Sequence, residues 1–104
     1  MKVVNEDLLD RFRAPVPCAW CRIRVATDPH HIFSRGAGRL DVAINLVSLC
    51  RLDHCNAHDG HQPTREQLLQ IVSRREKLPV ETILDRIYLL RRLPKNAEMP
   101  SWAT

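Results

Sequence analysis

Histidine and cysteine gather in one stretch of this chain, between residues 18 and 60. The sequence has 4 cysteines and 5 histidines among its 104 residues, and this stretch holds every cysteine and all but one histidine. Thiolates suit a closed structural zinc site, whereas imidazoles suit a metal ion that takes part in chemistry. Two kinds of ligand in one short stretch therefore predict an enzyme whose fold is held together by zinc.

The cysteines form two pairs that fit one structural zinc ion. Cys18 and Cys21 are two residues apart, so both sulfurs can reach a single ion, and Cys50 with Cys55 supplies the second pair. A second Cys-x-x-Cys would place a cysteine where Asp53 stands, which makes Asp53 the alternative to Cys55 as fourth ligand; we expect Cys55. A redox Cys-x-x-Cys pair, or a set of buried free thiols, fits these two clusters less well.

The histidines divide into residues that can bind metal and a residue that can move a proton. His54 and His58 are four apart, which on a helix places both rings on one face. His30 and His31 are adjacent, and neighbours on a strand point to opposite sides. One of them can bind a metal while the other takes a proton from water, as a hydrolytic site requires. His61 lies outside this spacing and is interpreted as a surface residue or a spare ligand.

The formal charge of +4 is concentrated beside these residues. Arginines outnumber acidic residues between positions 11 and 51, where the only acids are Asp28 and Asp41. Arginine is well suited to phosphate, so the pattern favours a nucleic-acid backbone as partner, with an ordinary solvated surface as the alternative. The arginines of this stretch are Arg11, Arg13, Arg22, Arg24, Arg35, Arg39 and Arg51.

The length and composition predict a single small α+β domain over residues 1–104. At 44% hydrophobic and 27% charged, the chain has a globular composition, and it contains no apolar run long enough for a membrane span. The first residues, MKVVNEDLLDRF, lack the apolar segment of a secretory signal. We therefore expect no membrane association and reduced, metal-bound cysteines.

Patterning divides the chain into four parts. Residues 5–12 are expected to form a helix capped by Asn5, and residues 18–60 a compact centre with two short strands, HHIF and INLVSLC, before the helix of His54 and His58. Residues 63–93 are expected to be helical, starting at a Thr64–Gln67 capping box. The wide apolar face over 80–93 either packs on the centre or forms a dimer or partner surface. Residues 94–104 are expected to be a loose tail.

The order of these residues resembles the motif of the HNH endonuclease family. The resemblance consists of HHI, then Asn45 within NLVSLC, then His54 with His58. Cys18-x-x-Cys21 and Cys50 are similar to the zinc-stapled branch that is common among phage and bacterial HNH proteins. The likeness covers residues 18–60 closely and the helical part after them less specifically. It implies a ββα-metal (HNH, His-Me finger) core with a structural zinc knuckle and flanking α-helices.

The resemblance also implies a role for each matched residue. His31 matches the general base that activates water, and Asn45 the residue whose side chain braces the loop bearing that base. His30, His54 and His58 match ligands of a catalytic divalent cation. Availability favours Mg²⁺ or Mn²⁺ as that cation, although imidazole binds Ni²⁺ or Zn²⁺ more tightly. The implied reaction is hydrolysis of DNA phosphodiester bonds, with weak sequence specificity.

The expected partner is DNA, with Arg35, Arg39 and Arg51 as candidates for phosphate contacts. A homodimer or a phage terminase is a further expected partner, and the resemblance implies the cytoplasm of a bacterium or of a phage-infected host. Two alternatives remain for the function. One is a zinc-binding nucleic-acid-binding module without catalysis, and the other is an accessory protein of phage packaging.

Overall fold

The computed structural model describes residues 1–34, 36 and 38–103. These residues form four α-helices and two small antiparallel sheets of two strands each, so the predicted mixed α+β class is confirmed. The elements are α1 (Glu6–Arg13), β1 (Val16–Pro17), β2 (Val25–Ala26), β3 (Asp28–His31), the 3₁₀ turn η2 (Ala43–Asn45), β4 (Leu46–Leu49), α2 (Arg51–His58), α3 (Arg65–Glu76), α4 (Val80–Arg92) and the 3₁₀ turn η3 (Ser101–Ala103).

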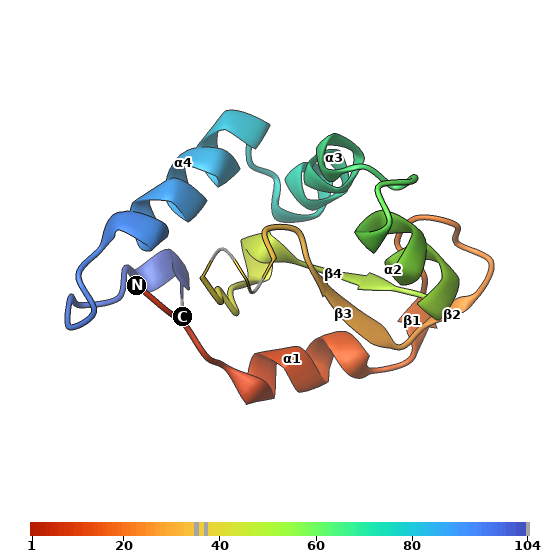
Figure 1. The fold of residues 1–104 in the computed structure, drawn as a ribbon, viewed down its shortest axis with the longest axis horizontal. Helices are drawn as coiled ribbons and strands as arrows, with labels where there is room; N and C mark the ends of the chain where they lie inside the picture. Colours follow the sequence, from red (N-terminus) through yellow and green to blue (C-terminus); the bar gives the residue numbers. More distant parts are fainter. Residues whose placement is uncertain (35, 37, 104) are drawn as a thin grey trace.

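The β3–β4 hairpin lies at the centre of the molecule. It runs between α1 on one side and the pair α3 and α4 on the other, with α2 beyond its end (Figure 1). The strands pair from Asp28 opposite Leu49 to His31 opposite Leu46. Leu46, Val47 and Leu49 are buried, which explains why the apolar run INLVSLC forms a strand in the core. The two predicted strands and the following helix are therefore confirmed.

Local sequence signals set where the helices begin. The side chain of Asn5 accepts a hydrogen bond from the Leu8 amide at 3.0 Å and so caps α1. Thr64 and Gln67 form the predicted capping box at the start of α3, with both reciprocal bonds present. Within the described residues, no helix combines the length and apolar character that a membrane span requires.

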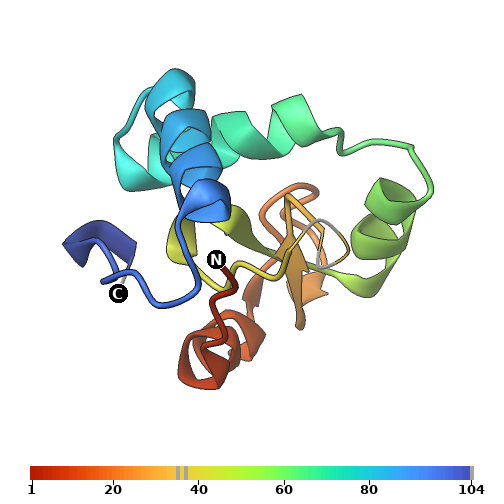
Figure 2. The same cartoon turned by 60° about the vertical axis from the view of Figure 1, so that its left-hand side comes forward.

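The apolar face of α4 packs on the molecule's own core. Ile83, Ile87 and Leu90 are fully buried, and this agrees with the first of the two interpretations of residues 80–93. Tyr88 and Leu89 remain partly exposed at 41% and 39%. Figure 2 shows α3 and α4 stacked over the hairpin, while α1 lies below it.

The prediction of a loose tail after residue 93 is wrong. Ser101–Ala103 forms the turn η3, Ala103 is buried, and Trp102 packs against the core. The guanidinium carbon of Arg86 lies 5.1 Å from the centre of the Trp102 ring, within the range of a cation–π contact. The tail is held in place because the large aromatic side chain of Trp102 packs on apolar surface. Composition alone does not indicate this contact.

Trp102→Ala is expected to lower the free energy of unfolding by about 1–2 kcal/mol, since a half-buried tryptophan loses apolar contacts and a cation–π partner. Urea unfolding monitored by circular dichroism measures the change. Asn96→Ala, at an exposed position of the same tail, is the control and should be neutral. Equal stability of the two variants would contradict a packed tail.

Candidate functional site

Helix α2 supplies ligands to two separate groups of metal-binding side chains. Asp53 joins Cys18, Cys21 and Cys50, and His54 and His58 join His30 on β3. In each group the ligand atoms all lie within 4.8 Å of one another. Successive residues of an α-helix point about 100° apart, so neighbours on α2 can face different groups. We call these the cysteine group and the histidine group.

The cysteine group has the spacing of a four-coordinate metal site. The Sγ atoms of Cys18 and Cys50 lie 3.1 and 3.3 Å from Oδ2 of Asp53. A sulfur and an oxygen bound to one tetrahedral zinc ion lie about 3.6 Å apart, so a small expansion admits the ion. Three thiolates and a carboxylate form a closed set of the kind found in structural zinc sites.

The surroundings of the cysteine group also favour a metal. Burial raises the pKa of Cys18 to about 11, so a cation is needed to hold it as a thiolate at neutral pH. Hydrogen bonds from the backbone of Arg24 and then of Ile23 lower the pKa of Cys21. The side chain of Arg24 lies 3.3 Å from Sγ of Cys50 and 3.7 Å from Asp53, where it offsets negative charge. The sequence analysis did not identify this role of Arg24.

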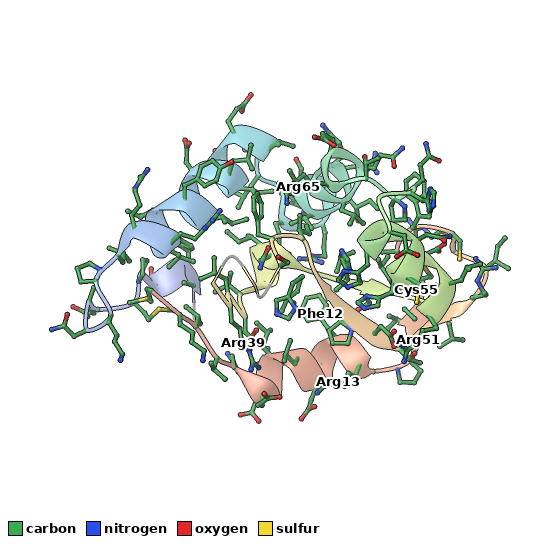
Figure 3. The ribbon with its side chains drawn as sticks, viewed as in Figure 1. Phe12, Arg13, Arg39, Arg51, Cys55 and Arg65 are labelled. Carbon is green, nitrogen blue, oxygen red and sulfur yellow. The ribbon has the colours of Figure 1, made fainter. Side chains whose placement is uncertain are left out.

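Asp53, the alternative to the predicted Cys55, is the fourth member of the cysteine group. Cys55 is exposed on α2 and lies outside the group (Figure 3). Cys50 is the N-cap of α2, and its sulfur accepts from the Asp53 amide at 3.5 Å. The third residue after an N-cap turns back toward it, whereas Cys55 is two residues and about 200° further around the helix.

The histidine group brings together the three predicted metal ligands. The Nδ1 atoms of His30 and His54 lie 3.1 Å apart, and the His54 and His58 ring centroids are 4.5 Å apart. Two nitrogens on one tetrahedral ion lie about 3.4 Å apart. Burial, then the charges of His54 and His58, lowers the pKa of His30 to about 4. Burial and then His58 also lower the pKa of His54, so both rings are in the neutral form that binds metal.

His31 lies beside the histidine group but has a different partner. Its Nε2 is 2.8 Å from Oδ1 of Asp41, a carboxylate that is fully buried. Burial opposes the ionisation of Asp41, but hydrogen bonds from Arg39, the Asn5 amide and His31 outweigh it and lower its pKa to about 2. An ionised carboxylate only accepts hydrogen bonds, so Nε2 of His31 is the donor in this contact.

Asp41, like Arg24, is a residue of the candidate site that was not predicted from the sequence. The carboxylate also accepts from the Asn5 amide at 2.9 Å and from Nε of Arg39 at 2.9 Å. Arg39 in turn donates to Glu6 at 2.8 Å. Asp41 lies ten residues after His31, beyond a loop whose path the sequence does not indicate. The one sequence feature that pointed to Asp41 is that it is one of two acidic residues in an arginine-rich stretch.

The side chain of Asn45 closes the loop that begins after His31. Its Oδ1 accepts from the Phe33 amide at 2.8 Å, and its Nδ2 donates to the carbonyls of Phe33 and Leu40 at 3.2 and 3.0 Å. Asn45 is fully buried, so these bonds are shielded from water. The arrangement has the bracing geometry that the sequence analysis expected.

A pocket of about 410 Å³ connects the histidine group with His31. His31, His54 and His58 line it together with Pro29, Ser34 and Gly36. His30 lies beneath, 6% exposed. A small polar ligand in this pocket can therefore contact His31, His54 and His58 together.

The three predicted phosphate-binding arginines have different surroundings. Arg35 lies outside the described residues. Arg39 is only 18% exposed and is engaged by Asp41 and Glu6, as its place between α1 and the hairpin suggests (Figure 3). Arg51 is 78% exposed at the start of α2, with one ion pair to Asp28 at 3.3 Å. Arg51 thus remains available to an external phosphate, while Arg39 helps to hold Asp41.

Cys55→Ser is expected to leave metal binding at the cysteine group unchanged, whereas Asp53→Ala and Cys21→Ser should each weaken it strongly, because they remove a ligand. Charge-transfer absorption between thiolate and Co²⁺ in the cobalt-substituted protein measures this binding, and the histidine group does not contribute to it. Loss of the absorption in Cys55→Ser, with retention in Asp53→Ala, would restore Cys55 as the ligand.

Asp41→Ala is expected to reduce the free energy of unfolding by about 3–5 kcal/mol, because it leaves buried donors without their anionic acceptor. Asp10→Ala is the matched control: Asp10 forms an exposed ion pair with Arg13, and its loss should cost less than about 1 kcal/mol. Chemical denaturation of both variants in the same buffer makes the comparison. Similar values would show that the network around Asp41 contributes little.

The geometry provides two candidate metal sites and one oriented histidine within a small globule. No protein-family model, curated protein or solved structure matches the chain. The cysteine group can hold an ion whose coordination positions are all filled by protein ligands. The histidine group can hold a second ion that keeps free coordination positions, and His31 beside it can accept a proton.

Proposed function

We propose that this chain is a metal-dependent DNA endonuclease of the HNH type, which nicks phosphodiester bonds with low sequence specificity and belongs with the phage and bacterial members of that family. One observation carries the proposal. His31, oriented by a buried carboxylate, opens onto the same pocket as His54 and His58 of the histidine group. Metal-assisted hydrolysis requires at least a proton acceptor and a cation site that face the same small space.

His31 serves as the general base in this mechanism. Asp41 holds the Nε2 proton, so Nδ1 accepts a proton from a water molecule in the pocket. The water then attacks phosphorus in line with the leaving oxygen. When the ring becomes positively charged, the adjacent Asp41 carboxylate stabilises it, as in the histidine–aspartate pairs of other hydrolases. General-base assistance of this kind is worth about 10²–10⁴ in rate.

His30, His54 and His58 are the residues that would hold the divalent cation. A cation there supplies positive charge to the phosphate oxygens and to the leaving group in the transition state. Three protein ligands leave coordination positions open, which distinguishes this group from the closed cysteine group. We assign the ion as Mg²⁺ or Mn²⁺ from availability, with Ni²⁺ or Zn²⁺ as the tighter-binding alternatives.

The cysteine group has a structural role in this proposal, with zinc as its ion. Cys18, Cys50 and Asp53 are buried and Cys21 is partly buried, and four protein ligands fill every coordination position of a tetrahedral ion. Zinc binding joins the segment after β1 to the start of α2, the helix that also carries His54 and His58. Free energies of structural zinc sites reach about 10–16 kcal/mol, comparable to the whole stability of a small domain.

The test is the nicking of supercoiled plasmid DNA in the presence of Mg²⁺, Mn²⁺, Ni²⁺ or Zn²⁺. We expect cleavage by the wild type and a rate about 10²–10⁴ lower for His31→Ala, because only the general base is removed. His61→Ala is the matched control, since His61 is exposed and does not line the pocket, and it should cut at the wild-type rate.

Two outcomes would contradict the proposal in different ways. Full activity of His31→Ala would remove His31 from the mechanism. DNA binding by the wild type without cleavage in any of the four metals would instead favour the non-catalytic zinc-binding module. Circular dichroism of each variant verifies that the fold is retained.

A further inference from the structure

A second pocket, far from the cysteine group, is surrounded by positive charge. It has a volume of about 680 Å³ and lies where the chain start meets the end of α4, at the left of Figure 1. Its described lining contains no acidic residue. The lining comprises four cationic side chains, Lys2, Arg91, Arg92 and Lys95, together with Met1, Gly38 and Tyr88.

Among the residues that the structure describes, these cations have no carboxylate partner. Lys2, Arg91, Arg92 and Lys95 are all exposed and take part in none of the ion pairs formed among the described residues. This contrasts with Arg39, whose guanidinium is shared by two carboxylates. Like charges that converge on a hollow without a partner repel one another, and an external anion relieves that repulsion.

The end of a helix does not account for this clustering by itself. Arg91 and Arg92 lie in the last turn of α4, where positive charge complements the helix dipole. Lys95, however, follows the helix, and Lys2 comes from the opposite end of the sequence. Lys2 and Lys95 thus add positive charge to the pocket, and the dipole of α4 does not explain their position there.

The basic pocket and the histidine pocket share one loop. Gly36 lines the histidine pocket, and Gly38 lines the basic one. Gly38 has φ +106°, and no atom lies within 4 Å of the position that a Cβ would take. The open space at Gly38 therefore allows a phosphate backbone to approach the basic pocket closely.

Aromatic and basic side chains continue between the two pockets. Phe33 follows His31 by two residues and is nearly buried at 5% exposed. The guanidinium carbons of Arg65 and Arg91 lie 4.5 and 5.9 Å from the Phe33 ring centre, and the Tyr88 ring lies 6.0 Å from it. The Phe33 ring thus contacts two guanidinium groups, and one of them, that of Arg91, also lines the basic pocket.

We propose that the basic pocket binds the phosphate backbone of the DNA strand at a point away from the scissile phosphate, through Lys2, Arg91, Arg92 and Lys95. This inference rests on the proposed function for the identity of the strand. Tyr88, which is 41% exposed, contributes its hydroxyl group to a phosphate oxygen or its ring to a sugar or base. The contacts are with phosphate, so they strengthen binding without reading sequence.

The test compares two triple variants in DNA binding, in a His31→Ala background so that the DNA stays intact. The first is Arg91→Gln/Arg92→Gln/Lys95→Gln. Fluorescence anisotropy with a 20-base-pair duplex (about two helical turns) is measured across a series of salt concentrations. Each lost phosphate contact should reduce the slope of log K against log salt by about 0.9, so a reduction of about 2–3 is expected, with at least a tenfold loss of affinity at low salt.

The matched control is Arg11→Gln/Arg13→Gln/Arg74→Gln, which removes the same charge from exposed positions on α1 and α3 outside the pocket. Its slope should change by less than 1. Equal losses in the two triple variants, or no loss in either, would overturn the proposal. Displacement of the DNA by inorganic phosphate but not by chloride at matched ionic strength would also overturn it, since the pocket would then be a site for the free anion.

The results separate this inference from the proposed function. DNA nicking by the wild type, combined with an unchanged slope in the first triple variant, would reject the pocket and keep the nuclease. Pocket-dependent binding without nicking in any metal would keep the pocket and reject the nuclease.

Discussion

The side chain of Asn45 makes the contact on which the rest of the site depends. Asn45 is fully buried at the end of the turn η2 and bonds to backbone groups of Phe33 and Leu40, on both sides of the loop. His31 lies just before that loop and Asp41 just after it. The three bonds therefore fix the distance between a histidine and the carboxylate that orients it. Each buried polar group left without its partner would cost about 1–3 kcal/mol, so the loop has one strongly preferred closure.

The second constraint is the orientation of α2 about its own axis. Cys50 caps the helix and also belongs to the cysteine group, so the same residue sets where the helix begins and which side chains face the metal ligands. With that start, Asp53 turns toward the sulfurs and His54 and His58 turn toward His30. A shift of one residue would rotate every ligand by about 100° and separate both groups. The two candidate metal sites are thus coupled through one short helix.

Sequence patterns predicted the parts of this site that depend on local geometry. The four-residue spacing of His54 and His58, the alternation of His30 and His31 on a strand, and the helix cap at Asn5 follow from helix and strand periodicity. Cys55 was chosen over Asp53 because sulfur is the better zinc ligand, but helix phase outweighs ligand preference. The partner of His31 and the packing of Trp102 depend on how distant segments meet, which no local pattern encodes.

The basic pocket lies at one end of the molecule's longest dimension of 40 Å. It forms where the chain start meets the end of α4, away from β1 and β2 (Figure 1). Residues from both ends of the sequence, Met1 and Lys2 on one side and Arg91, Arg92 and Lys95 on the other, line it together. Shortening the chain at its N-terminus would therefore alter the pocket without removing any side chain of the cysteine group or the histidine group.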